Sequence, residues 1–515
     1  MIHYLHALIP CLLAQQPFIE PAVLEGDNVA GVGLVTLIDN LAINDSGDWR
    51  VEADTDNADT NADSVMLSPG LTVFLREGDA LTLPAGASLD SFDSVTLNNL
   101  GHSGWNFFLD GTIGTSDDSG IYINANLVLQ ESFISTSPGF SPGTPYIGFF
   151  ETKINDSNRI LVVASVDDPI IASTVDRALV VLDTDPSGAL LGETVLAKEG
   201  DVLPGQIETV ADFGTGPHNF AFNNAGSALY FADLNGDTTL DGVIYLDSTI
   251  LAQEGSPGPI PGRNWENLSS RPMDLNNLGG FVFRGDLNGD TTTDEVIVQN
   301  GAVIVQEGDS LPGIAPFRLT GFGTGPLLID DGGNVLWFGD WDDPDTTRDT
   351  GLFLNRTLLV QEGETLINGM LLESLSSTQD AFSLSDNGKW ILFEGSLAGA
   401  VNGAFRASFP LTLLEPTPGI AGQVNILVAN NATPNAGVHF AGGRLPGATL
   451  VNCGAGTITL DMADPRRLGL SFADAFGSAG ISGNVPASLA GATILLQAVD
   501  SSNCEVSNLV VYTLQ

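Results

Sequence analysis

The chain has 515 residues, enough to bury several hydrophobic cores and to form more than one domain. Its 17 basic and 63 acidic residues give a net charge of −46, which disfavours nucleic acid and anionic membrane surfaces as partners and favours cations. The 60 Gly and 27 Pro residues, with only 16% charged residues, argue against a helical protein and predict short strands joined by turns.

Residues 1–16, MIHYLHALIPCLLAQQ, contain an apolar stretch from Leu5 to Leu13 followed by the small residue Ala14. This pattern predicts a secretory signal peptide, and with it a secreted or cell-surface protein. A buried first strand is the alternative interpretation. No later segment is long and apolar enough to predict a membrane-spanning helix.

A Glu-Gly marker recurs along the chain, at the end of an apolar strand and, in most copies, before a Pro-Gly turn. The copies are AVLEGDNVAG (22–31), VFLREGDALTLPAG (73–86), LVLQESFISTSPG (127–139, a worn copy), VLAKEGDVLPG (195–205), ILAQEGSPGPIPG (250–262), VIVQEGDSLPG (303–313) and LLVQEGETLING (358–369). The Glu positions 25, 77, 131, 199, 254, 307 and 362 are 52, 54, 68, 55, 53 and 55 residues apart. One copy per unit indicates a structural role, and we expect each Glu to accept backbone N–H bonds at a turn.

A second marker follows each Glu-Gly strand: an Asn, Asp and Gly turn that opens a strand of alternating apolar residues. Examples are NNLGGFVFRGD (276–286) and DDGGNVLWFGD (330–340). A third short strand, such as EVIVQN (295–300), joins the next Glu-Gly strand through a hairpin. With one further segment per unit, about four strands repeat about seven times, which predicts a β-propeller of about seven blades over residues 20–410.

Two segments compete to supply the strand that closes such a ring. The repeat begins with its Glu-Gly strand, so the last blade lacks that strand at its C-terminal end. Residues 22–26 could fill the gap, but LTLLEP (411–416) resembles another copy of the same strand. The sequence does not decide between the two segments.

The Asn-x-x-Gly-then-Phe pattern over about residues 20–410 resembles the NxxGxxxF-type tandem repeats of bacterial surface proteins. The resemblance implies a bacterial, extracellular repeat protein. This chain departs from the pattern because it ends without a hydrophobic anchor and basic tail, so we expect release or non-covalent retention at the surface.

Two acidic loops carry the most specific local signal, DLNGDTTLDG (233–242) and DLNGDTTTDE (286–295). Carboxylate and amide oxygens at loop positions 1, 3, 5 and 9, with a backbone carbonyl at position 7, suit Ca²⁺, a hard ion that binds oxygen. The predicted ligands are Asp233, Asn235, Asp237, Thr239 and Asp241, and Asp286, Asn288, Asp290, Thr292 and Asp294. The spacing resembles the calcium loops in the propeller of integrin α subunits.

Two further loops carry a variant of this pattern that is one residue longer. The candidate ligands are Asp54, Asp56, Asp59 and Asp63 in one loop and Asp340, Asp342, Asp345 and Asp349 in the other. In all four loops the bound Ca²⁺ would be structural. The alternative is that Asp, Asn, Gly and Thr are present only because they form good turns.

Enzyme constellations are not evident. His102, His218 and His439 are isolated, with no metal-ligand spacing, and no nucleophile elbow is present. The two GFGTGP-like stretches lack the Lys-Ser/Thr and helix of a phosphate-binding loop and read as turns. A propeller with a carboxylate-lined central channel would nevertheless be compatible with a hydrolase or lyase.

After residue 416 the repeat stops, and residues 417–515 read as short strands and turns that predict a β-sandwich domain. Cys453 and Cys504 remain if the signal is removed, and an even count in a secreted chain predicts one disulfide, with two buried thiols as the alternative. The closing segment, SLAGATILLQAVDSSNCEVSNLVVYTL, resembles a C-terminal module of secreted myxobacterial and planctomycete proteins. That resemblance implies a role in sorting or surface attachment.

These features together predict a non-enzymatic, extracellular, calcium-stabilised repeat protein for surface binding or adhesion. Its partner would be a glycan, a protein or the cell envelope. A secreted propeller hydrolase or lyase acting on polysaccharide is one alternative, and a structural envelope component is another. Converging acids in a central channel would favour the enzyme, and a broad exposed aromatic patch would favour binding.

Overall fold

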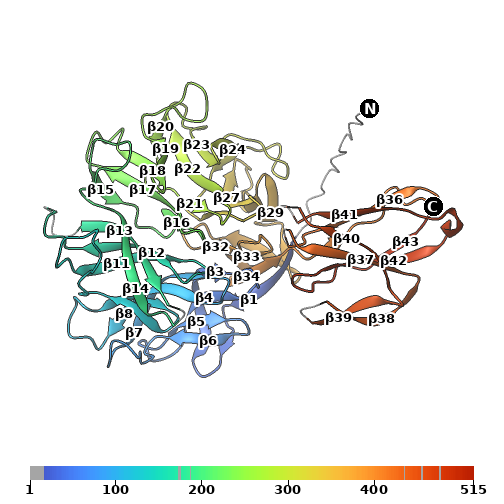
Figure 1. Cartoon of the computed structure of the whole chain (residues 1–515), viewed down its shortest axis with the longest axis horizontal. Helices are drawn as coiled ribbons and strands as arrows, with labels where there is room; N and C mark the ends of the chain where they lie inside the picture. Colours follow the sequence, from blue (N-terminus) through green and yellow to red (C-terminus); the bar gives the residue numbers. More distant parts are fainter. Residues whose placement is uncertain (1–16, 172–175, 186, 434, 454–455, 475–476) are drawn as a thin grey trace. The chain divides into compact units, whose positions relative to one another are not determined.

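The computed structural model describes residues 17–515 except 172–175, 186, 434, 454–455 and 475–476, so the predicted signal peptide lies outside the described residues. The described residues form an all-β protein whose single helical element is the 3-10 turn η1 (Ala487–Leu489), as the composition predicts. None of them forms a helix that could span a membrane. Two compact units are present, one of residues Ile19–Ala407 and a smaller one that contains Ser408–Gln515 (Figure 1).

The described strands of the larger unit form seven antiparallel sheets that follow one another along the chain. The first sheet contains β2 (Asn28–Val29), β3 (Gly33–Ile43), β4 (Trp49–Thr55), β5 (Ser64–Ser68) and β6 (Thr72–Arg76). The second contains β7 (Ser88–Leu97), β8 (Ser103–Asp110), β9 (Ser119–Ile123) and β10 (Asn126–Gln130). The third contains β11 (Tyr146–Ile154), β12 (Ile160–Val166), β13 (Asp176–Thr184) and β14 (Leu190–Lys198).

The next three sheets are each built from five strands. The fourth contains β15 (Val210–Phe213), β16 (Phe220–Phe222), β17 (Ala228–Leu234), β18 (Gly242–Leu246) and β19 (Thr249–Gln253). The fifth contains β20 (Trp265–Asn267), β21 (Met273–Leu275), β22 (Phe281–Leu287), β23 (Glu295–Gln299) and β24 (Ala302–Gln306). The sixth contains β25 (Leu319–Gly321), β26 (Leu327–Ile329), β27 (Val335–Trp341), β28 (Thr350–Leu354) and β29 (Thr357–Gln361).

The seventh sheet combines strands from the two ends of the larger unit. It contains β30 (Leu366–Ile367), β31 (Met370–Leu375), β32 (Phe382–Leu384), β33 (Trp390–Leu397) and β34 (Val401–Ser408), and β1 (Phe18–Leu24) pairs with β34 (Figure 1). Residues 18–24 therefore complete this sheet. The competing segment instead forms β35 (Thr412–Leu413), which pairs with β36 (Val424–Asn430) in the smaller unit.

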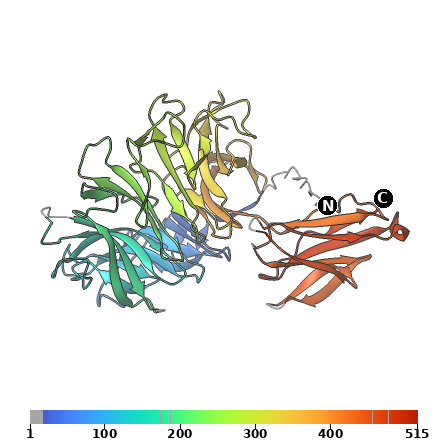
Figure 2. The same cartoon turned by 45° about the horizontal axis from the view of Figure 1, so that its top comes forward.

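The hydrophobic core of the larger unit lies between sheets. Strand β12 (ILVVASV) is buried along its whole length, which explains why such strands read as continuous apolar runs. Leu392 and Ala404 of the seventh sheet pack in one cluster with Val51 of the first. The innermost strands β3, β7, β11, β16, β21, β26 and β32 contact one another in this order, and β32 contacts β3. The sheets follow one another in chain order, from blue to orange (Figure 2).

The Glu-Gly marker forms the junction between consecutive sheets. The Glu254 N–H donates to Gly242 O within the fourth sheet, and the Gly255 N–H donates to Trp265 O of the fifth. Gly255 has φ +74°, in the left-handed region that favours glycine, and a Cβ there would lie 2.0 Å from a methyl carbon of Leu240. At the first copy, the Glu25 N–H binds Asn402 O of the seventh sheet and the Gly26 N–H binds Val35 O of the first.

The smaller unit has two sheets that share a core and one separate hairpin. One sheet contains β35, β36 and β41 (Ala479–Asn484), and the other contains β40 (Arg466–Phe472), β37 (Gly437–Gly443), β42 (Thr493–Asp500) and β43 (Val510–Thr513). Residues of both sheets, such as Leu427 and Phe440, pack in one cluster. The hairpin consists of β38 (Leu445–Asn452) and β39 (Thr457–Ala463). Cys453 and Cys504 form a disulfide, which confirms the predicted pairing.

Candidate functional site

The four acidic loops join β4 to β5, β17 to β18, β22 to β23 and β27 to β28. The first acid of each loop lies at the end of the strand before it, and the last acid directly precedes the strand after it; the pairs are Asp54 and Asp63, Asp233 and Asp241, Asp286 and Asp294, and Asp340 and Asp349. In the fourth sheet, burial raises the pKa of Asp233, and the charge of Asp241 raises it further. The loops therefore bring their first and last acids together, as their spacing predicts.

The middle acids of the loops accept hydrogen bonds from residues of their own turns. Asp237 Oδ1 accepts the Thr239 N–H at 3.2 Å and the Thr239 hydroxyl at 2.9 Å. Asp290 and Asp345 make the same pair of contacts with Thr292 and Thr347. Three position-3 side chains bind a neighbouring strand instead, because Asn288, Asp342 and Asp56 accept the N–H groups of Asn264, Arg318 and Leu34. Most of these oxygens already have hydrogen-bond donors within the protein.

The Glu of the Glu-Gly marker lies against the acidic loop, a connection that the sequence analysis missed. Glu254 accepts the Gly242 N–H at 3.2 Å and the Leu268 N–H at 2.8 Å, which confirms its predicted capping role. Burial and the neighbouring Asp294 raise the pKa of Glu307 to about 7. Burial and Asp63 likewise raise the pKa of Glu77. Each Glu is thus a further acid beside the last Asp of its loop.

The side chain of the residue before this Glu donates a hydrogen bond to a backbone carbonyl of the same loop. Gln253 Nε2 donates to Leu240 O at 3.1 Å, and Gln361 Nε2 donates to Arg348 O at 2.9 Å. In the first sheet, Arg76 Nε donates to Ala62 O at 2.7 Å. The marker and the loop therefore form one structural unit, although about 13 residues separate each pair of partners.

Acidic loops with the same residue spacing differ in the arginines that contact them. In the 286–294 loop, the Arg263 guanidinium donates to the carbonyls of Asn288 (2.6 Å), Thr293 (2.6 Å) and Leu287 (2.9 Å). Arg271 forms an ion pair with Asp286 and another, at 3.0 Å, with Glu295. A guanidinium thus already pairs with Asp286, the first predicted ligand, and a second binds three carbonyls of the same loop.

The other loops differ in the same respect. In the 340–349 loop, Arg348 Nε lies 3.1 Å from Asp343 Oδ2. In the 54–63 loop, Arg76 donates to the Ala62 carbonyl. In the 233–241 loop, no described Lys or Arg forms an ion pair or a side-chain hydrogen bond. Within the described part of the chain, no three His, Cys, Asp or Glu side chains are already arranged as a metal site. The 233–241 loop is therefore the one of the four that no described cationic side chain binds.

The second marker builds a ring of hydrogen bonds around the innermost strands. In five consecutive sheets an Asn side chain donates to the backbone carbonyl of the next turn: Asn44 to Asn98, Asn98 to Asn155, Asn155 to Asn223, Asn223 to Asn276 and Asn276 to Asp330, at 2.8–3.1 Å. The following residues form a second series, in which the Asp45 N–H donates to Asn99 Oδ1 at 2.9 Å. The Asn387 N–H of the seventh sheet returns to Asp45 Oδ1 at 2.7 Å, so the series closes on itself.

Carboxyl groups collect at this ring. The pKa of Asp386 is raised to about 7 by burial and by the charges of Asp45 and Asp331, and burial raises the pKa of Asp45 to about 6. Asn99 and Asn277 donate to Asp386 Oδ2 at 3.1 and 2.9 Å. A cavity of about 110 Å³ lies among these turns and is lined by Asp156, Asp274 and Asp386.

A second group of acids lies on β4, β11 and β33 and in the turn before β32. Burial raises the pKa of Glu52, Glu151 and Glu394 to about 8 each and that of Asp380 to about 6. Lys153 is the cation among them: its charge lowers the pKa values of Glu151, Asp274 and Asp380, and burial lowers its own. Burial also holds the pKa of His218 well below its usual value, and its ring lies 4.0 Å from Asp380.

These buried acids are absent from the predicted sites because they come from different repeat units and share no local pattern. The signal that could have found them is positional. Glu151 and Lys153 both lie on the innermost strand β11, which is otherwise rich in apolar residues. Charged residues on a strand predicted to be innermost would face the axis of a ring.

The chain was compared with known proteins. Residues 14–250 match a family of unknown function (DUF7453). That match covers less than half of the chain, and no curated protein matches. A fungal alcohol oxidase of the AA5 family in complex with copper is 11% identical, with a TM-score of 0.31, and the alignment covers 94% of this chain and 100% of the oxidase. A glycoside hydrolase of family 32 from Bifidobacterium adolescentis is 11% identical, with a TM-score of 0.22 and coverages of 90% and 84%.

Proposed function

We propose that the protein is an extracellular binding or adhesion protein, built as a seven-bladed β-propeller followed by a β-sandwich domain. The cyclic contacts of the seven innermost strands and the return of Asn387 to Asp45 support the propeller. The shared core of two sheets supports the sandwich. The predicted signal peptide, together with the disulfide, supports an extracellular location.

The binding site that we propose is the acidic axis of the propeller, and the observation that carries it is the cluster of Glu151, Glu394 and Asp380, in which the charge of Asp380 raises the pKa of both glutamates. Raised pKa values at a group of neighbouring acids are typical of functional sites, because a fold built only for stability avoids such clusters. The ligand would carry positive charge, because a cation favours the ionised form of these buried carboxyls and, among the described residues, Lys153 is the cation beside them. A glycan is less favoured, because the exposed aromatic side chains of the described chain are phenylalanines and include no Trp or Tyr.

The experiment is a screen of the labelled protein on combined cationic-peptide and glycan arrays, with a matched pair of variants. The axial variant is Glu394→Gln/Asp380→Asn, and the control is Glu266→Gln/Asp309→Asn, away from the axis. We expect binding to amine-bearing probes that the axial variant loses and the control retains. Equal binding by both variants would show that the overall negative charge, and not the axis, attracts the probe.

We also propose that Ca²⁺ stabilises the 233–241 loop. In this loop, Asp233 and Asp241 would supply ligands together with Glu254 and the Thr239 carbonyl. A hard ion that binds carboxylate oxygens would offset the repulsion that raises the pKa of Asp233. The matched pair is Asp241→Asn and Asp294→Asn, because these residues occupy the same position in a loop without and a loop with Arg263. We expect Ca²⁺ to raise the Tm of wild type and Asp294→Asn, and to raise that of Asp241→Asn less. Identical shifts in both variants, or none in wild type, would contradict the proposal.

A secreted enzyme acting on polysaccharide is the second candidate, favoured by one observation. Carboxyls with pKa values of about 8 and about 6 lie near one lysine, so a protonated and an ionised carboxyl coexist near neutral pH. Release of reducing ends from a polysaccharide panel, lost in Glu151→Gln, would establish the enzyme. No release by wild type would exclude it for those substrates.

A further inference from the structure

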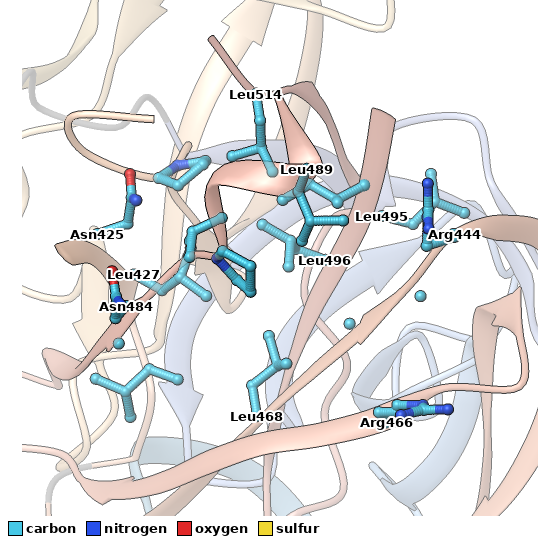
Figure 3. A pocket seen from close by; sticks show the side chains of 18 of the residues that line it. Asn425, Leu427, Arg444, Arg466, Leu468, Asn484, Leu489, Leu495, Leu496 and Leu514 are labelled. Carbon is cyan, nitrogen blue, oxygen red and sulfur yellow. The ribbon is translucent and has the colours of Figure 1, made fainter. Parts of the chain in front are cut away.

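The smaller unit contains a cavity of about 690 Å³ that no part of the proposed function uses (Figure 3). This volume lies within the roughly 300–1,000 Å³ of typical small-molecule sites. The cavity lies between the two sheets, against β36, β40, β41 and β42, with Leu489 of η1 and Leu514 near the C-terminus completing its wall. All of its lining residues belong to the smaller unit.

The lining is aliphatic. Leucines such as Leu427, Leu468 and Leu496 dominate it, together with Ile481 and Ile494, and none of its described lining residues is aromatic. Sugars and nucleobases are usually held by stacking on aromatic rings, so these classes fit poorly here. A flexible hydrocarbon chain needs only apolar surface and matches this lining.

The polar end of the cavity is cationic. Arg444, Arg466 and the adjacent Arg467 are the only Lys or Arg residues between 408 and 515, and Arg444 and Arg466 lie on one side of the cavity, apart from Asn425 and Asn484 (Figure 3). Neither guanidinium has an ion pair or hydrogen bond with a described residue. Asp464 also lines this end, so the two arginines leave a net positive charge.

Asn425, one of the polar side chains of the wall, already has hydrogen-bond partners within the protein. Asn425 is buried, accepts the Gly419 and Ile420 N–H groups at 2.6 and 3.1 Å, and donates to Ile420 O at 2.9 Å. The two arginines are the cationic groups of the wall that are free to bind a ligand. In a chain with a net charge of −46, two arginines at one side of an apolar cavity are complementary to an anionic head with an apolar body.

We propose that this cavity binds a long-chain fatty carboxylate, with the chain among the leucines and the carboxylate at Arg444 and Arg466. This site is independent of the axis and of Ca²⁺. Its ligand class differs from that of the axial site, because the cavity selects an anion and the axis a cation.

The test uses the full chain and a dansyl-labelled undecanoate whose fluorescence rises on entering an apolar site. We expect saturable binding to one site, displacement by hexadecanoate, and weaker displacement by hexadecan-1-ol. Arg444→Gln/Arg466→Gln should weaken binding by about tenfold or more, the effect of losing charge-assisted hydrogen bonds. The matched control, Arg318→Gln/Arg356→Gln in the larger unit, should bind as wild type does.

A second variant tests the cavity itself. Leu468 is 49% exposed, so Leu468→Trp can narrow the cavity without removing a buried core residue, and we expect it to abolish binding while the melting curve stays cooperative. The absence of saturable binding to wild type, or binding unchanged in both variants, would overturn the proposal. Equal affinity for the alcohol would overturn it too, as would a concentration-dependent dimer that Leu468→Trp abolishes, because a second copy would then cover the cavity.

Discussion

The asparagines of the second marker each serve two sheets. Asn223 Oδ1 accepts the Ser227 N–H at 2.9 Å within its own turn, while its Nδ2 donates to Asn276 O at 3.1 Å in the next. The side chain is 3% exposed, so water cannot replace either bond. One buried amide thus fixes both the shape of a turn and its distance from the neighbouring turn.

We predict that Asn223→Ala lowers the free energy of unfolding by about 1–3 kcal/mol, the cost of leaving buried polar groups without partners. The measurement is denaturant unfolding followed by tryptophan fluorescence. The control is Asn61→Ala, whose side chain is exposed, and we expect it to change stability little. An equal loss in both variants would mean that the bond between sheets contributes nothing measurable.

At the scale of single residues, the sequence predicted the turns but not the hydrogen bonds between sheets. The Asn and Gly residues predicted turns because their conformational preferences are local. The bond from Asn223 to residue 276 could not be predicted, because it depends on how one sheet packs on the next. The same holds for Arg263, which follows a Pro-Gly turn and reaches carbonyls about 25–30 residues later.

At the scale of elements, β1 is the strand that joins the two ends of the larger unit. Val23 is fully buried in the cluster between the seventh and first sheets, and the Glu25 side chain accepts a hydrogen bond from Asn402 Nδ2 at 2.7 Å. We predict that deletion of residues 1–24 lowers the Tm sharply and exposes β34 as an unpaired edge, with association of copies as the result. Light scattering and thermal melting measure both effects.

A matched deletion of residues 1–16 keeps β1 and should melt as the full chain does. Addition of a synthetic peptide FIEPAVLEG should restore part of the stability of the longer deletion, because it supplies the missing strand. A longer deletion that melts like the full chain would show that β1 is dispensable.

The acidic loops give a second prediction at this scale. Arg263→Gln removes the guanidinium from the carbonyls of the 286–294 loop and should lower the Tm. Ca²⁺ should then offset the loss, because the freed carbonyls and the loop acids suit a hard cation. The comparison is the Tm of the variant with Ca²⁺ and with EDTA. A calcium response equal to that of wild type would show that the arginine and the ion do not compete.

The acidic loops also show what their spacing alone does not predict, namely which arginines contact them. The spacing of Asp233, Asp237 and Asp241 correctly predicted a loop between two strands with its first and last acids together. The identical spacing of 286–294 predicted the same site, but charge balance depends on Arg263 and Arg271, which lie upstream in other segments. Loop spacing indicates where a cation could bind, while neighbouring segments decide whether one is needed.

At the scale of the whole molecule, the repeat in the sequence predicted the number of sheets and their order. It could not choose between 22–26 and 411–416 as the closing strand, since both carry the same apolar pattern. The decision lies in packing: Val23 fits the cluster between the seventh and first sheets, while Leu411 and Leu413 belong to the core of the smaller unit. Two segments with similar sequences therefore join different sheets because their apolar side chains pack in different cores.

The buried acids predict an unusual dependence of stability on pH. The pKa values of Glu52, Glu151 and Glu394 are about 8 in the folded protein, against about 4.3 for an exposed glutamate. Between these values the folded state binds more protons than the unfolded state, so stability falls as the pH rises. Below about pH 4 the opposite effect begins. Hydrogen bonds from Lys198 and Ser141 lower the pKa of Asp168 to about 2 in the folded protein, so the stability that the ionised Asp168 contributes is lost as the pH falls.

We therefore predict that the Tm, measured in EDTA, is highest near pH 5 and falls by several degrees toward pH 8. Replacing the three buried glutamates with Glu52→Gln, Glu151→Gln and Glu394→Gln should flatten this slope, because glutamine does not titrate. The matched control replaces the exposed Glu208, Glu266 and Glu373 with Gln and reduces the net negative charge equally. If the control flattens the slope as much as the variant of the buried glutamates does, the dependence comes from the repulsion of the whole acidic surface. A slope lost only in the variant of Glu52, Glu151 and Glu394 would assign the pH dependence to these three buried glutamates.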